Sequence, residues 1–125
     1  MSEKNSKQFG VWMDPRTATV AGRQDVHSGD FVILGQVSNP GANNNSSERT
    51  SNNQEIGLRT KYFKEVANLM QNIDEIHITG TGQVQEQFIK FLAETPQYKN
   101  AKASESTSNK MNDDQLIEFV TKHFN

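Results

Sequence analysis

Apolar and polar residues alternate in the first third of the chain, which is typical of β-strands. Residues 8–13 alternate apolar side chains between two faces, and residues 17–21 alternate β-branched residues with alanine. Asp14 and Pro15 between them favour a turn, because proline fixes φ and aspartate accepts hydrogen bonds from the following backbone. So short a connection predicts an antiparallel hairpin. The apolar run 31–37 extends it to a three-stranded meander.

The composition changes abruptly after this third predicted strand. Residues 38–54 are rich in asparagine and serine and contain no aliphatic side chain larger than alanine. Such a segment buries too little apolar area to offset its backbone entropy, so it is predicted to be a flexible loop. Long loops inside compact domains are often functional. Residues 1–7 are polar and are predicted to be a disordered tail, which leaves residues 8–125 as a single domain.

Helical and strand patterns alternate in the second half of the chain. The predicted elements are a helix at 55–72, a buried strand at 75–79, a helix from Val84 that Pro96 ends, a strand at 98–103 and a helix at 113–124. Ala101 and Ala103 are expected to point inward from the last strand. A polar loop, 104–110, follows it. Asn112 is expected to cap the final helix, whose first turn holds Asp113 and Asp114 where the helix dipole favours negative charge.

The order of these elements predicts the fold class. Three antiparallel strands followed by two parallel crossovers give an α/β fold with a mixed five-stranded sheet, β-β-β-α-β-α-β-α, and helices packed on it. This is the ribonuclease H-like plan.

Charge and cysteine content narrow the function classes. The formal net charge is −2, so the chain is not a strongly basic nucleic-acid binder and any RNA contact must come from a local patch. The absence of cysteine excludes disulfides, thiolate metal sites and cysteine nucleophiles. The polar N-terminus and the lack of a long apolar run predict no signal peptide and no membrane span. We therefore expect a cytoplasmic protein with no membrane partner.

No residue pattern indicates catalysis. His27, His77 and His123 stand far apart in the sequence, without metal-ligand spacing. A two-metal nuclease on this fold needs converging carboxylates. Asp14 lies at the end of the first predicted strand, but the predicted strand at 75–79 has no carboxylate at its C-terminal end. We predict no catalytic residues, no metal site and no cofactor, and a non-enzymatic role is favoured.

The turn Gly80-Thr81-Gly82-Gln83 is the first candidate binding site. A strand that turns on glycines into a helix can cradle a phosphate with backbone N–H groups, and it is equally the form of an ordinary tight turn. Gln85 occupies the position of the third glycine in a dinucleotide fingerprint, so that motif is incomplete.

A basic segment is the second candidate. Arg49, Arg59, Lys61 and Lys64 lie in the predicted loop and in the helix that follows it. They form either a solvated helix face or a small phosphate-contacting patch beside the loop.

Two stretches resemble a known family. Residues 9–18, FGVWMDPRTA, are similar to the opening V-W-[IM]-D-x-R-x-A hairpin of small bacterial proteins related to Pelota and to the middle domain of archaeal and eukaryotic class-I peptide release factors. Residues 76–88, IHITGTGQVQEQF, resemble the I-x-I-x-G-x-G-x-x-[KQ]-x-x-[FL] turn of the same family. The resemblance runs from about Phe9 to Phe124. It implies the translational machinery component fold, a relative of the ribonuclease H-like plan.

The resemblance also implies a function, with one departure. In release factors the loop after the third strand carries a Gly-Gly-Gln motif. Residues 38–54 hold no such motif, and Gly82-Gln83 lies in a different loop. What the resemblance implies is therefore a translation-associated module that contacts the ribosome, transfer RNA or ribosomal RNA without hydrolysis. The alternative is a protein, such as a degenerate hydrolase, that binds a small molecule or nucleotide phosphate at Gly80–Gln83.

Overall fold

The computed structural model describes residues 7–23, 31–39, 52–70, 73–96 and 98–124. Its elements are β1 (Gln8–Met13), β2 (Thr17–Gly22), β3 (Val32–Ser38), α1 (Asn52–Asn68), β4 (Glu75–Gly80), α2 (Val84–Glu94), β5 (Lys102–Thr107) and α3 (Asp113–Phe124). Most of the predicted tail, 1–7, and of the predicted loop, 38–54, lies outside the described residues. Within the described ranges, no helix is long and apolar enough to cross a bilayer.

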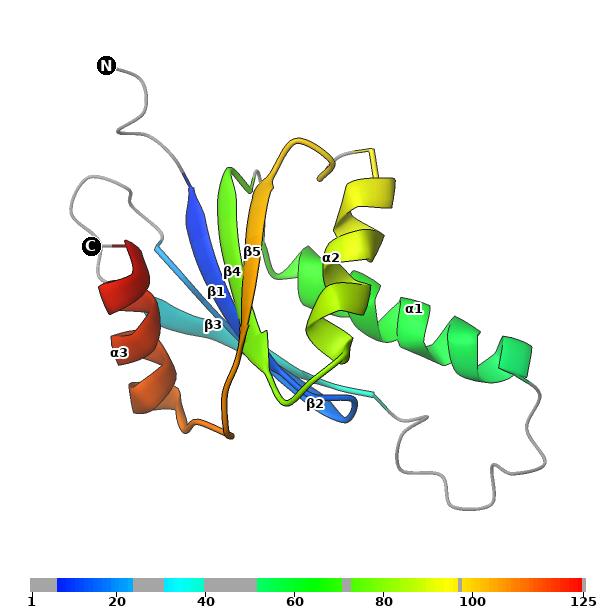
Figure 1. The fold of residues 1–125 in the computed structure, drawn as a ribbon, viewed down its shortest axis with the longest axis horizontal. Helices are drawn as coiled ribbons and strands as arrows, with labels where there is room; N and C mark the ends of the chain where they lie inside the picture. The colour runs from blue at the N-terminus through cyan, green and yellow to red at the C-terminus, as the bar shows by residue number, and fades with distance from the viewer. Residues whose placement is uncertain (1–6, 24–30, 40–51, 71–72, 97, 125) are drawn as a thin grey trace.

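The strands form one five-stranded sheet in the order β3-β2-β1-β4-β5. The pairs β1–β2 and β2–β3 are antiparallel, and the pairs β1–β4 and β4–β5 are parallel. Helices α1 and α2 cover one face, and α3 covers the other (Figure 1). This arrangement confirms the predicted mixed α/β sheet.

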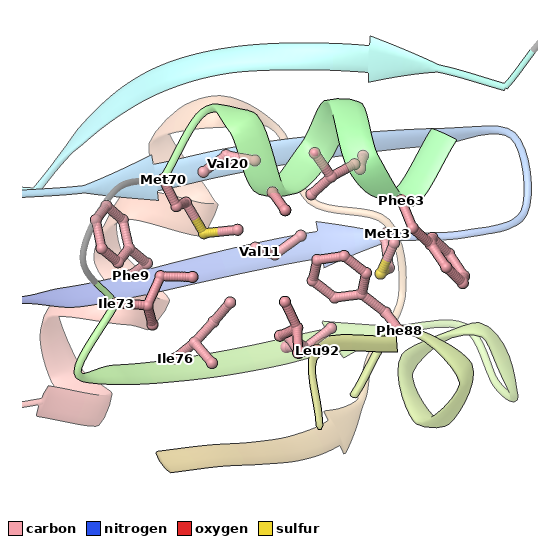
Figure 2. Close-up of a cluster of buried hydrophobic side chains, with 14 of the residues drawn as sticks. Phe9, Val11, Met13, Val20, Phe63, Met70, Ile73, Ile76, Phe88 and Leu92 are labelled. Atoms are coloured by element: carbon pink, nitrogen blue, oxygen red, sulfur yellow. The ribbon is translucent and has the colours of Figure 1, made fainter. Parts of the chain in front are cut away.

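Because side chains alternate between the two faces of each strand, the sheet has two hydrophobic cores, one on each face. The larger core lies under α1 and α2, where Val11 of β1 and Ile76 of β4 are buried in one cluster with Phe63 and Phe88 of the helices (Figure 2). The smaller core lies under α3 and includes Trp12, Ala21, Phe31, Leu116 and Val120. Burial on both faces fixes the register of the central strands, because a slip of one residue would exchange the faces.

Local hydrogen bonds confirm the predicted hairpin turn and helix cap. An Asp14 carboxylate oxygen accepts the N–H groups of Arg16 and Thr17, both at 2.8 Å. At the start of α3, the Asn112 side chain accepts the Gln115 N–H at 2.8 Å, and the Gln115 side chain accepts the Asn112 N–H at 3.0 Å. This reciprocal pair is a capping box.

The predicted position of the fifth strand is wrong. Residues 98–101 form turns and a bend, and β5 covers Lys102–Thr107, most of which was predicted to be a polar loop. Ala103 is exposed rather than inward, and Ala101 is partly buried. The strand forms because its backbone pairs with β4 at the sheet edge, and an edge strand needs few apolar side chains.

The ends of α1 also differ from the prediction. The helix begins at Asn52 rather than Glu55 and ends at Asn68 rather than Asn72. The N–H groups of Leu69 and Met70 bond to the carbonyl groups of Val66 and Ala67, three residues back. The last turn is therefore tightened, as is common where a helix ends.

Candidate functional site

The Gly80–Gln83 turn lies where the C-terminal ends of β1 and β4 meet. Met13 pairs with Gly80 at this end of the two parallel strands. A Cβ on Gly80 would overlap the Met13 carbonyl oxygen, so this glycine lets the strand ends pack closely. At Gly82 an added Cβ would meet no atom within 4 Å. In open α/β sheets, ligands bind beyond the carboxyl ends of the strands.

A buried glutamine holds this turn in place. The Gln85 side chain is fully buried. Its oxygen accepts the Gly82 N–H at 3.1 Å, and its Nε2 donates to the Ser106 carbonyl at 2.9 Å. The Gly82 N–H, one of the donors that a phosphate cradle would use, is therefore engaged inside the turn. Gln85 also ties the turn to β5.

A cavity of about 430 Å³ opens beside the turn. Its walls come from the β1–β2 turn, the residue after β3, α1, the Gly80–Gln83 turn and the first half of α2. The described lining residues are Pro15, Asn39, Arg59, Tyr62, Thr81, Gly82, Gln83, Val84 and Gln87. Arg59 of the basic segment and the glycine turn, two separate candidates in the sequence, thus line a single site.

Two residues give the cavity a firm wall. The buried Tyr62 donates its hydroxyl to the Asp14 carbonyl at 2.8 Å. Burial, and secondarily the negative charge of Asp14, raise the Tyr62 pKa well above its ordinary value, so this side chain stays a neutral phenol. Asn39 is also buried. Its N–H donates to the Arg16 carbonyl at 2.7 Å and its Nδ2 to the Pro15 carbonyl at 3.1 Å, which joins the end of β3 to the hairpin turn.

The described lining residues are mostly uncharged. Of the described residues around the cavity, Arg59 is the one charged residue, and Asn39, Gln83 and Gln87 contribute carboxamides. A guanidinium pairs well with phosphate, and a carboxamide both donates and accepts hydrogen bonds. These described residues include no carboxylate, imidazole or amine that would serve as a general acid or base.

Two other basic candidates, Lys61 and Lys64, are not among the described residues that line this cavity. Lys61 and Lys64 are exposed on α1. Lys64 borders a second cavity of about 210 Å³ with Phe91 and Tyr98. Arg49 lies outside the described residues.

A polar cluster on the α3 face is absent from the sequence predictions. His77 of β4 is buried. Its Nδ1 lies 2.7 Å from the Ser104 hydroxyl and its Nε2 lies 2.9 Å from the Ser106 hydroxyl. The Ser106 hydroxyl donates to Thr79 at 2.9 Å. Nε2 therefore donates to Ser106 and Nδ1 accepts from Ser104, since a hydroxyl donates only once.

His123 of α3 completes this cluster. Its ring centroid lies 4.0 Å from that of His77. Burial, and secondarily His123, lower the His77 pKa to about 4. The spacing of the two histidines in the sequence does not predict this contact, because it is the packing of α3 against the sheet that brings their rings together. His27 lies outside the described residues, and no three potential ligands among His, Cys, Asp and Glu converge on a metal-binding position in the described part of the chain.

Comparison with known proteins gives matches among solved structures. Neither the protein-family models nor the curated protein sequences match this chain. Pelota from Thermoplasma acidophilum matches 95% of the chain with a TM-score of 0.62 and 21% identity. Pelota from Archaeoglobus fulgidus matches 98% of it (TM-score 0.53, 12% identity), and the archaeal translation termination factor aRF1 matches 93% (TM-score 0.59, 13% identity).

The chain has a Pelota-like fold. It corresponds to 33% of the length of each of these three proteins. At these identities the likeness is one of fold, and it confirms the architecture that the two sequence motifs implied. The Pelota-like sheet places the cavity beyond the ends of β1 and β4.

Proposed function

We propose that this chain is a non-enzymatic, translation-associated module that contacts the ribosome, transfer RNA or ribosomal RNA. The observation that carries the proposal is the Pelota-like fold, which two Pelota proteins and a translation termination factor share over 93% or more of the chain. The two motif resemblances at residues 9–18 and 76–88 support it. Peptide release is left out of the proposal because residues 38–54 contain no Gly-Gly-Gln.

The proposed contact surface is basic and belongs largely to α1. Lys61 and Lys64 are exposed, and Arg59 is half-buried at the cavity. Arg49 precedes this helix in the sequence and is proposed to belong to the same surface. With a net charge of −2, the chain would bind a polyanion through such a local patch rather than through its overall charge.

Cosedimentation with ribosomes at moderate salt tests this function. The wild-type protein is expected in the ribosomal fraction. The double variant Lys61→Glu/Lys64→Glu should bind more weakly. The slope of log K against log salt concentration should become less steep by about 0.7–0.9 for each phosphate contact that is lost.

A matched control is Lys102→Glu/Lys122→Glu, which makes the same charge change at two exposed residues of β5 and α3. Absence of the wild-type protein from ribosomal fractions, together with no RNA recovered by crosslinking, would disprove the function. Equal losses in the two double variants would show that net charge, rather than α1, governs binding.

A second candidate is binding of a free small molecule or nucleotide phosphate at Gly80, Thr81, Gly82 and Gln83. Three of these residues, Thr81, Gly82 and Gln83, line the cavity together with Arg59, which favours this candidate. A ligand that binds the folded state raises the melting temperature, so a thermal-shift screen with nucleotides and inorganic phosphate tests it. No shift with any of these compounds would exclude their binding.

A further inference from the structure

The cavity beside α1 has the size of a small-ligand site. Its volume of about 430 Å³ lies in the range of about 300–1,000 Å³ that is usual for such sites. Both α1 and the turn that precedes α2 contribute to its lining. The cavity therefore lies next to the surface proposed to contact RNA.

The charge at the cavity favours an anionic group. Arg59 is the one charged residue among the described lining residues. The Asp14 carboxylate of the adjoining hairpin accepts two backbone N–H groups of its own turn. A phosphate group would pair with the Arg59 guanidinium, whose forked donors match its oxygens.

The uncharged polar groups that line the cavity with Arg59 favour a nucleobase. Gln83 is exposed and its side chain makes no capping hydrogen bond to α2, and Gln87 is half-buried one turn later. Carboxamides present a donor and an acceptor side by side, which matches the edges of nucleobases. Single-stranded RNA can place an unstacked base in a protein pocket, whereas a paired base must first leave its duplex.

We propose that this cavity binds one nucleotide of a single-stranded RNA, with the phosphate on Arg59 and the base edge on the carboxamides of Gln83 and Gln87. The inference rests on the proposed function, since it names the RNA feature that the α1 surface would recognise. It joins the basic helix and the glycine turn into one recognition site.

The variant Gln83→Glu tests the site with a minimal change. The substitution keeps the shape of the side chain and adds a negative charge at the cavity. A glutamate at this N-cap position is favoured by the α2 dipole, so the fold is retained. The control is Gln115→Glu, a change of equal charge on α3, where a glutamate oxygen can still accept the Asn112 N–H.

The readout is fluorescence anisotropy with a labelled, single-stranded oligoribonucleotide. Gln83→Glu should weaken binding about tenfold or more, and Gln115→Glu should leave it unchanged. Equal affinities of the two variants would overturn the inference. So would a duplex RNA that binds as tightly as the single strand.

Chemical shifts of the side-chain amides of Gln83 and Gln87 separate the possible ligand sources. Nucleoside monophosphates should shift these signals, and the oligoribonucleotide should do so at a lower concentration. If inorganic phosphate shifts them at the same concentration as the nucleotides, the base makes no contact and the inference fails. It also fails if a free nucleotide binds as tightly as the oligoribonucleotide.

The two proposals fail in different ways. If Lys61→Glu/Lys64→Glu weakens RNA binding and Gln83→Glu does not, the translation-associated function stands and the nucleotide site is wrong. If the wild-type protein binds neither ribosomes nor RNA, both are wrong.

Discussion

The buried side chain of His77 is expected to make the stability of the fold depend on pH. Both of its ring nitrogens are bonded to serine hydroxyls, and its pKa is lowered from 6.5 to about 4, mainly by burial and secondarily by His123. The unfolded chain therefore binds a proton at higher pH than the folded chain does. The contribution of the neutral His77 to the free energy of unfolding is therefore fully present above pH 6.5 and is lost as the pH falls towards 4.

The first prediction follows from this shift. The melting temperature should fall as the pH is lowered from about 6.5 to about 4, and the variant His77→Gln should show a smaller fall over this interval. Thermal unfolding followed by circular dichroism at a series of pH values measures both. An identical pH dependence in the two proteins would contradict the assignment to His77.

Gly80 and Gly82 provide a second prediction at the residue scale. Gly80→Ala should destabilise the fold by about 1–3 kcal/mol or more, because the new methyl group meets the Met13 carbonyl oxygen rather than a side chain that can move. Gly82→Ala should change stability by less than about 0.5 kcal/mol, because its Cβ enters open space. Urea denaturation compares the two variants. Similar losses at both positions would show that the turn is packed differently.

At the scale of the elements, α2 and β5 depend on each other through Gln85. The variant Gln85→Leu replaces the buried carboxamide by an apolar side chain of similar size and leaves the Gly82 N–H and the Ser106 carbonyl without this partner. We expect a loss of about 1–3 kcal/mol and faster amide hydrogen exchange along β5. Exchange in α3 serves as the internal control. Uniform acceleration in β5 and α3 would point to global loss of stability rather than to release of the edge strand.

Elements marked by local chemistry could be predicted from the sequence, whereas the position of β5, which depends on its pairing with β4, could not. Asp14 with Pro15 marks the hairpin turn, and Asn112 marks the start of α3, because each acts on the backbone within three residues. The strand β5 has mostly exposed side chains, so its own pattern resembles that of a loop. Placing it at 98–103 also hid the pairing of His77 with Ser104.

The candidate site was predictable only in parts, for the same reason. Arg59 and the Gly80–Gln83 turn each have a recognisable local pattern. Their meeting at one cavity depends on tertiary packing, in which Tyr62 of α1 bonds to the Asp14 carbonyl after β1, and no local spacing encodes this packing. Asn39 was treated as part of a flexible loop, although its hydrogen bonds to the hairpin turn make it a fixed wall of the cavity.

At the scale of the whole molecule, the sheet separates two polar regions. Helices α1 and α2, which contribute residues to the cavity, cover one face of the sheet, and α3, which carries His123 of the His77 cluster, covers the other (Figure 1). The alternation of β4 explains this division, because Ile76 and Ile78 face one core while His77 and Thr79 face the other side. The sheet therefore separates the cavity that is proposed to bind RNA from the buried His77 cluster.

Ser106 belongs to both regions at once. Its carbonyl group accepts from Gln85, which holds the turn beside the cavity, while its hydroxyl group bonds to His77 and Thr79. A ligand that shifted the turn would move the Ser106 carbonyl group, and the hydroxyl group of the same residue is hydrogen-bonded to His77. Protonation of His77 would then change the affinity of the cavity for its ligand. By thermodynamic reciprocity, binding of the ligand would change the affinity of His77 for a proton by the same factor. If the proposed nucleotide shifts this turn when it binds, its affinity should therefore depend on pH through Ser106.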